Sequence, residues 1–194
     1  MAYDALAESI ALIESRHLVR VERLSRRRRF VAMSLDVADD LAVTSFARRG
    51  VGRTWHDTHV LARREGHWVL LGGSGSSGDD QGELLADRPH ELLEWSAAAS
   101  RFVTTAASLT TAGTGGVHDS RGGSGRWPWS GRWVRHTDVR TSATAATLTI
   151  GNRILPVPWH GRMAVVWTGR RGPLVVARDR DGQRLGQVVL TDRP

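Results

Sequence analysis

The chain has 194 residues, and its 27 basic residues, all arginine, outnumber 20 acidic residues to give a net charge of +7, which favours anionic partners. It contains no cysteine, which excludes disulfide bonds and zinc sites built on thiolates. No segment approaches the roughly 20 apolar residues of a membrane-spanning helix, and the N-terminus lacks a signal-peptide pattern, so we expect a cytoplasmic protein.

A long amphipathic helix is predicted near the N-terminus, from Asp4 to about Arg27. The apolar residues that recur along it at helical spacing are Leu6, Ile10, Ile13, Val21 and Leu24. Asp4 is the expected N-cap, and no glycine or proline interrupts the run. An alternative interpretation starts a strand at Leu18, because Val19 and Val21 alternate with charged residues. In either case a helix of at least three turns is expected to lie across the apolar face of the sheet that follows.

Four short strands are predicted in succession after this helix, separated by tight turns. They are Phe30–Val37, Leu41–Arg48, Thr54–Arg63 and Trp68–Gly72. In the first strand the alternation places four apolar residues on one face, namely Val31, Met33, Leu35 and Val37. Because the links between the strands are short, neighbouring strands must be antiparallel, and the prediction is a four-stranded antiparallel meander.

The middle of the chain is predicted to connect two domains. Gly72–Gly82 has the composition of a loop, and Glu83–Glu94 is weakly helical. One strand is expected around Phe102–Thr105. Thr110–Gly125 contains six glycines and few side chains that could be buried. We therefore expect a partly disordered, Ala/Thr/Gly-rich connection over residues 96–126.

Strand patterns return after this connection. The six candidates are Trp133–Val139, Ala145–Ile150, Arg153–Val157, Met163–Trp167, Leu174–Ala177 and Leu185–Leu190. Gly151-Asn152 and Asp179–Gly182 are typical hairpin turns. The run Leu174–Gly182, followed by Gly186–Leu190, resembles the last hairpin of bacterial immunoglobulin-like modules. That resemblance covers fewer than 20 residues and implies no function. The regular spacing of short strands and turns predicts a β-sandwich or a small barrel.

Arginine residues gather at one end of the predicted meander. They are Arg26, Arg27, Arg28 and Arg29 before the first strand, and Arg48, Arg49 and Arg53 around the second turn. Alternate turns of a meander lie at the same end of the sheet, so all seven share one end, whereas Asp39 and Asp40 lie at the other. Guanidinium groups match phosphate and carboxylate geometry, which predicts an anion-binding or partner-binding patch. The alternative is a solvated edge that supports solubility.

A second candidate surface lies just past the connection, where tryptophan and arginine alternate. Its predicted partner-binding residues are Trp127, Trp129, Arg126 and Arg132. Aromatic and arginine side chains of this kind stack on bases or anchor protein interfaces. The alternative is that these tryptophans cap the core. Trp133 and Trp167 are expected inside the sandwich core.

Asp57 and His59 are two residues apart on a predicted strand and therefore share a face. Such a pair can act as a general base or supply two ligands of an open metal site. No third ligand can be named from the sequence, so we predict neither a metal nor a cofactor and interpret the pair as structural.

Together these patterns predict an α+β region followed by an all-β region. A helix packs on a four-stranded antiparallel sheet in residues 1–95, and a small immunoglobulin-like β-sandwich occupies residues 127–194. The favoured function is a non-enzymatic binding or assembly module for a protein, an anionic surface or a nucleic acid. The alternative is a small-molecule-binding or hydrolytic enzyme, with a pocket between helix and sheet around Asp57 and His59.

Overall fold

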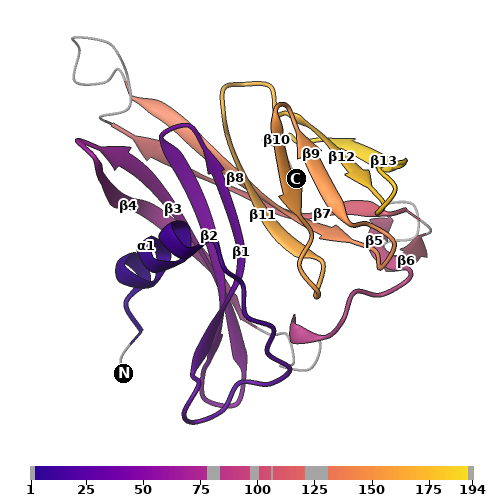
Figure 1. Cartoon of the computed structure of the whole chain (residues 1–194), viewed down its shortest axis with the longest axis horizontal. Helices are drawn as coiled ribbons and strands as arrows, with labels where there is room; N and C mark the ends of the chain where they lie inside the picture. The colour runs from indigo at the N-terminus through magenta and orange to yellow at the C-terminus, as the bar shows by residue number, and fades with distance from the viewer. Residues whose placement is uncertain (1–2, 78–83, 97–100, 106, 121–130, 192–194) are drawn as a thin grey trace.

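The computed structural model describes residues 3–77, 84–96, 101–105, 107–120 and 131–191 (Figure 1). Within these residues it contains one helix, α1 (Ala5–Ser15), and thirteen strands in antiparallel sheets. The first four strands form one sheet, here called the meander sheet, in the order β1-β2-β3-β4. They are β1 (Phe30–Ala38), β2 (Leu41–Arg49), β3 (Thr54–Arg64) and β4 (His67–Ser77). The predicted antiparallel meander is therefore confirmed.

Two further sheets are built from the second half of the chain. The middle sheet has the order β11-β8-β7 and comprises β7 (Leu109–Asp119), β8 (Arg132–Thr141) and β11 (Arg162–Thr168). The outer sheet has the order β10-β9-β12-β13 and comprises β9 (Thr147–Ile150), β10 (Arg153–Pro156), β12 (Leu174–Arg178) and β13 (Arg184–Val189). A separate two-stranded sheet pairs β5 (Leu92–Ser96) with β6 (Arg101–Thr105). No helix in the described part of the chain is long and apolar enough to cross a membrane.

The helix and the three larger sheets are stacked as successive layers (Figure 1). Ile13 of α1 packs against Ala42 and Leu61 on one face of the meander sheet, as predicted for the helix. The other face of the meander sheet packs on the middle sheet through the apolar side chains of Leu41, Val43, Val60, Ala62, Val134, Ala164 and Val166. Alternate residues of β11, such as Val165, face the outer sheet instead. The middle sheet thus supplies side chains to two cores.

This stacking bears on the predicted division into domains. Strands from 1–95 and from 127–194 contribute to one apolar cluster, because Val60 and Val134 belong to it together. The antiparallel sheets of the second half are present, and both predicted hairpin turns are confirmed by the pairing of β9 with β10 and of β12 with β13. The immunoglobulin-like arrangement of the second half stays a prediction.

The helix is shorter than the sequence indicates. Asp4 caps it by accepting hydrogen bonds from the backbone N–H groups of Leu6 and Ala7, as expected. The helix ends at Ser15, and Arg16 takes the left-handed conformation with φ 50°. Neither the longer helix nor the alternative strand from Leu18 forms. Val21 and Leu24 are instead buried from an irregular segment, because tertiary packing outweighs helical periodicity.

A β-bulge in β1 reverses the faces predicted for this strand. Pairing with β2 shifts register between Ala32 and Ser34, and one extra residue turns every later side chain to the opposite face. Val31 and Met33 therefore pack in one cluster, while Leu35 packs against the helix side in another. The predicted single apolar face is wrong for this reason. The polar side chains that follow the bulge turn toward the middle sheet.

These polar side chains cap the free edge of β11. Ser34 Oγ accepts a hydrogen bond from the Ala164 N–H at 3.1 Å, and Asp36 Oδ2 accepts one from the Val166 N–H at 3.0 Å. Arg153 of the outer sheet donates to the Asp36 carboxylate at 2.5–2.6 Å. Asp36 is fully buried, and burial raises the pKa of its carboxyl group while Arg153 opposes that rise. One carboxylate therefore joins three sheets and satisfies an edge that would otherwise be open.

Two glycine-rich segments that were predicted to be loops are strands. β4 continues through Ser77, and β7 occupies much of the predicted disordered connection. Some of their glycines are required by close packing: a β-carbon at Gly73 would lie 2.5 Å from the Thr58 carbonyl oxygen. One at Gly115 would lie 2.4 Å from the His136 ring. Glycine here reflects close approach rather than flexibility.

Of the weak helix predicted over Glu83–Glu94, Leu84 and Leu85 are helical, residues 86–91 are irregular, Leu92 begins β5, and Glu83 lies outside the described residues. The strand expected around Phe102–Thr105 is present as β6. All six strands predicted in the second half are present as β8 to β13. Alternation and turn chemistry were sufficient for these elements because each is a local pattern.

Candidate anion-binding site

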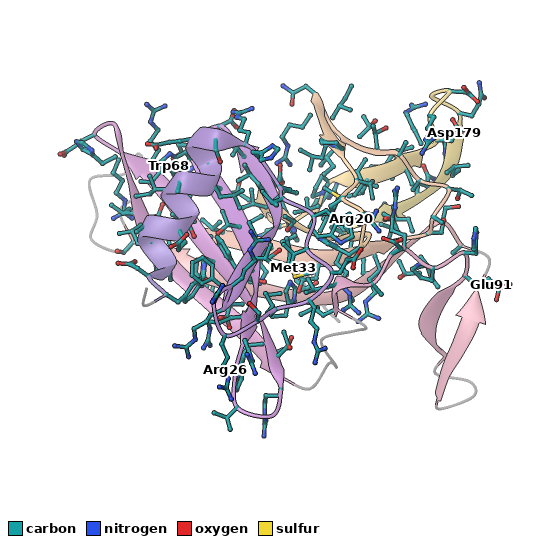
Figure 2. The ribbon with its side chains drawn as sticks, turned by 60° about the horizontal axis from the view of Figure 1, so that its bottom comes forward. Arg20, Arg26, Met33, Trp68, Glu91 and Asp179 are labelled. Atoms are coloured by element: carbon teal, nitrogen blue, oxygen red, sulfur yellow. The ribbon has the colours of Figure 1, made fainter. Side chains whose placement is uncertain are left out.

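Seven arginines lie together at one end of the meander sheet, here called the arginine end. They are Arg26, Arg27, Arg28, Arg29, Arg48, Arg49 and Arg53. Phe30 of β1 is paired with Arg48 of β2, and the Arg49 N–H donates to the Arg29 carbonyl oxygen at 2.7 Å. The segment before β1 and the β2–β3 turn therefore meet at a projecting tip of the molecule (Figures 1 and 2). The predicted placement of these residues at one end matches the observed pairing.

The arginine end is exposed and carries little compensating charge. The four arginines before β1 are exposed, as is Arg53, whereas Arg48 and Arg49 are half-buried. Asp57 Oδ2 accepts from Arg48 Nε at 2.6 Å and so neutralises one of the seven. Within the described residues, five of the seven form no ion pair through their side chains, namely Arg26, Arg27, Arg28, Arg29 and Arg49. Unpaired guanidinium groups are donors available to phosphate, sulfate or carboxylate oxygens.

Trp55 stabilises this end of the sheet, which the sequence did not indicate. The guanidinium carbons of Arg48 and Arg53 lie 5.9 Å and 5.8 Å from the centroid of its indole ring. Gly50 lies against the edge of the same ring, where a β-carbon would be 2.5 Å from Trp55 Nε1. The ring therefore holds two arginines and the turn in place. The sequence feature that could have indicated this contact is a tryptophan directly after the arginine-bearing turn.

The β2–β3 turn is part of this end. The Gly50 N–H donates to the Arg53 carbonyl oxygen at 2.9 Å, which closes the turn. Gly52 takes φ +71°, a conformation that favours glycine. Val51 lies between these glycines and is 99% exposed. An apolar side chain is therefore almost fully exposed among the arginines of this end.

Asp57 and His59 lie on the helix-facing side of β3 and are bound to their neighbours. Asp57 is held by Arg48, and His59 Nδ1 lies 3.3 Å from the hydroxyl of Ser9. The hydroxyl of Tyr3 is 3.4 Å from His59 Nε2, and burial lowers the pKa of this histidine. Aromatic rings fill the space around His59. These contacts agree with the structural interpretation of the pair.

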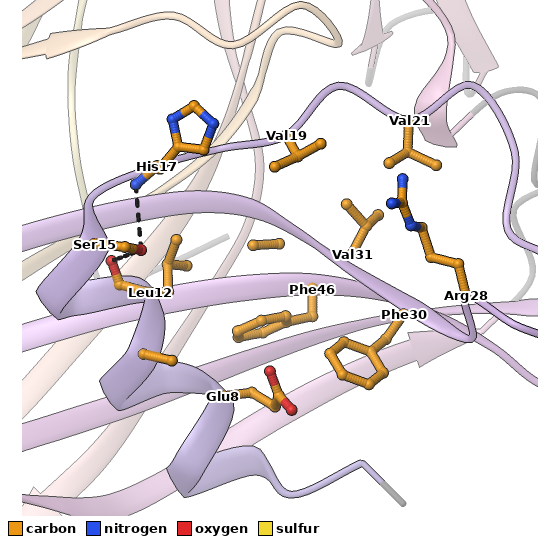
Figure 3. A pocket seen from close by; sticks show the side chains of 12 residues that line it. Glu8, Leu12, Ser15, His17, Val19, Val21, Arg28, Phe30, Val31 and Phe46 are labelled. Atoms are coloured by element: carbon orange, nitrogen blue, oxygen red, sulfur yellow. Dashed lines mark hydrogen bonds between the residues drawn. The ribbon is translucent and has the colours of Figure 1, made fainter. Parts of the chain in front are cut away.

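A groove does exist between helix and sheet, but at another position (Figure 3). It has a volume of about 270 Å³ and lies between α1, residues 17–21 and strands β1 and β2. Its apolar lining includes Leu12, Phe30 and Phe46, while Glu8 and Arg28 supply its charges. Asp57 and His59 do not line it. Arg28 belongs to both the groove and the arginine end.

The second predicted surface is only partly described. Arg126, Trp127 and Trp129 lie outside the described residues. Arg132 Nη1 donates to Asp40 Oδ1 at 3.1 Å, and its Nε donates to Asp119 Oδ2 at 3.4 Å. The hydrogen bond from this guanidinium lowers the pKa of Asp40. Arg132 is thus tied into an ion-pair network that links the meander and middle sheets.

The two tryptophans predicted for the core have different environments. Trp167 is buried between the middle and outer sheets, as predicted. Trp133 is 55% exposed, so its predicted core position is wrong. It lies on β8 beside the His118 ring, with ring centroids 5.5 Å apart. It contributes to the surface rather than to the core.

A polar cluster between the meander and middle sheets was not predicted. Burial raises the pKa of Asp138 to about 6. Asp138 Oδ1 and Arg140 Nε are buried without a hydrogen-bond partner among the described residues. Arg140 lies directly opposite Arg162, and both line a pocket of about 250 Å³. Burial also lowers the pKa of nearby His160 to about 3, so this histidine is neutral.

Within the described part of the chain, no group of three or more His, Asp or Glu side chains is arranged to hold a metal ion. Comparison with protein-family models, with curated proteins and with solved structures finds no match to this chain.

Proposed function

We propose that this chain is a non-enzymatic binding or assembly module that engages an anionic partner, on a protein or another polyanion, through the arginine end. The observation that carries the proposal is the pairing of Arg29 with Arg49, which gathers seven arginines from two segments at one projecting tip. Guanidinium groups held close together, with few carboxylates among them, bind phosphate, sulfate and carboxylate oxygens in a bidentate manner. A contact surface at Trp127 and Trp129 remains part of this proposal.

The proposal separates charge placement from net charge, and two matched variants test the difference. The tip variant is R26E/R27E/R29E/R49E, and the control is R170E/R171E/R180E/R184E at exposed positions of the second half. Each changes four positive charges to negative and takes the net charge from +7 to 7 − 8 = −1. Elution from immobilised heparin, a sulfated polyanion, is measured for both. We expect the tip variant to lose retention and the control to keep most of it.

Two results would contradict the proposal. Equal losses from the two variants would reduce the effect to net charge and contradict the proposal. A parent protein that is not retained at low salt would contradict it as well. Thermal unfolding of both variants serves as the control for folding, because exposed charges contribute roughly 0–1 kcal/mol each.

A second candidate function is small-molecule binding in the groove between α1 and the meander sheet. The observation in its favour is an apolar recess of about 270 Å³ with Arg28 beside Phe30. This combination suits a small apolar anion. The fluorescent probe anilinonaphthalene sulfonate has that chemistry, and its binding should be lost in A11F, which fills the groove from an exposed position of the helix. Unchanged probe binding in A11F would remove this candidate.

A further inference from the structure

The β2–β3 turn presents an apolar residue where the rest of the arginine end presents charge. Val51 is 99% exposed at the tip, with glycine on either side and arginine at positions 49 and 53. An exposed valine taken alone is ordinary on a protein surface. Its position in a turn among exposed arginines is the second observation, because a flat anionic partner that binds these arginines also meets an apolar side chain.

The turn is held so that Val51 stays extended from the molecule. Gly50 packs on the edge of the Trp55 indole, and the hydrogen bond from the Gly50 N–H to the Arg53 carbonyl oxygen closes the loop behind Val51. Trp55 is half-buried directly beneath, with arginines over its ring. Arginine and tryptophan around a projecting aliphatic side chain are the groups that lie at the boundary between lipid headgroups and acyl chains.

The same geometry disfavours a nucleic acid as the partner. Single-stranded nucleic acids stack their bases on free aromatic faces, but the Trp55 ring is already engaged by Arg48 and Arg53. The phosphate backbone of a nucleic acid offers no apolar group for the exposed Val51 side chain to contact. A bilayer offers both a plane of phosphates for the arginines and an apolar layer beneath them for Val51.

We infer that the arginine end binds the surface of an anionic lipid bilayer, with Val51 entering the layer beneath the headgroups. This inference rests on the proposed function and names the partner of the same site. Arginines near an anionic surface supply attraction that weakens with salt. Insertion of Val51 adds affinity only for a bilayer, because a soluble polyanion has no apolar layer for this side chain to enter.

The absence of cysteine allows a direct measurement of that depth. A single environment-sensitive nitrobenzoxadiazole label is placed at V51C, and a matched label at D181C marks the exposed β12–β13 turn. Each protein is mixed with phosphatidylcholine vesicles that contain or lack phosphatidylglycerol. We expect label 51 alone to brighten and shift to the blue, only with the anionic vesicles, and high salt to reverse the change.

A second variant separates this inference from the proposed function. V51S should weaken sedimentation with anionic vesicles up to about tenfold, because it removes the apolar side chain without changing the charge, while heparin retention changes little. Retention on heparin without vesicle binding in the parent would overturn the inference and leave the proposed function standing. A label at Val51 that stays water-exposed on vesicle-bound protein would also overturn it. Binding to neither heparin nor vesicles would contradict both.

Discussion

Replacing Asp36 by alanine should be among the most damaging single changes in this fold. Its buried carboxylate accepts from Arg153 at 2.5–2.6 Å and from the Val166 N–H at 3.0 Å, and these bonds join the meander, middle and outer sheets. The alanine variant leaves Arg153 without its counter-charge and the Val166 N–H without its acceptor. Both groups are then poorly solvated.

The expected size of the loss follows from these two orphaned groups. Breaking a buried ion pair by removing one partner costs about 3–5 kcal/mol. The Arg153 side chain is 18% exposed to solvent, and it can still donate to the Val166 carbonyl oxygen in the variant. Both features favour the lower end of that range. S34A removes only a neutral hydroxyl from the same edge of β11 and should cost about 1 kcal/mol.

A double-mutant cycle measured by urea unfolding tests this reasoning. D36V/R153M replaces the pair by apolar groups, and it should lose less stability than D36A alone, because no buried charge remains unpaired. A D36A loss below about 1 kcal/mol would refute the role assigned to Asp36. The two single variants of the cycle are D36V and R153M, and a double variant that loses the sum of their two losses would refute the ion pair as the cause.

Two further predictions concern Asp138 and the glycines of β7. The folded pKa of Asp138, about 6, lies above the ordinary value of 3.8, so the native state binds its proton more tightly than the unfolded state does. Stability should therefore fall as pH rises from about 4 to 6, and D138N should be more stable than the parent at pH 7 by at most about 3 kcal/mol. A pH-independent difference between D138N and the parent would contradict this. G115A should lower the thermal midpoint more than G113A, because a β-carbon meets the His136 ring at 2.4 Å at the first position and nothing within 4 Å at the second; equal effects would argue against the close packing of β7.

The sequence predicted those features that depend on neighbouring residues. Alternation and turn residues located the meander and the strands of the second half, and the antiparallel rule placed Arg26 and Arg49 at one end of the sheet. Gly151 and Gly182 both take positive φ in the predicted hairpin turns. Local chemistry was sufficient in each case.

Features set by distant residues could not be predicted in this way. Asp36 and Arg153 are separated by 117 positions, and alternation alone placed Asp36 on a polar face rather than in the core. The β-bulge that turns Asp36 toward the core cannot be recognised from the alternation of apolar and polar residues in this strand. Glycines in β7 were interpreted as flexibility because the His136 ring they accommodate belongs to another strand. Trp55 was overlooked since its contacts with Arg48 depend on strand pairing.

The salt dependence of heparin binding tests most directly whether the arginine end is the binding site. The logarithm of the binding constant is plotted against the logarithm of salt concentration for the parent, the tip variant and the matched control. Each arginine that pairs with an anion adds to the steepness of that line, because counterions are released on binding. We predict that the control retains the slope of the parent and that the tip variant, if it binds at all, shows a clearly shallower one. Slopes reduced equally in both variants, or a parent line without slope, would contradict the assignment of binding to the arginine end.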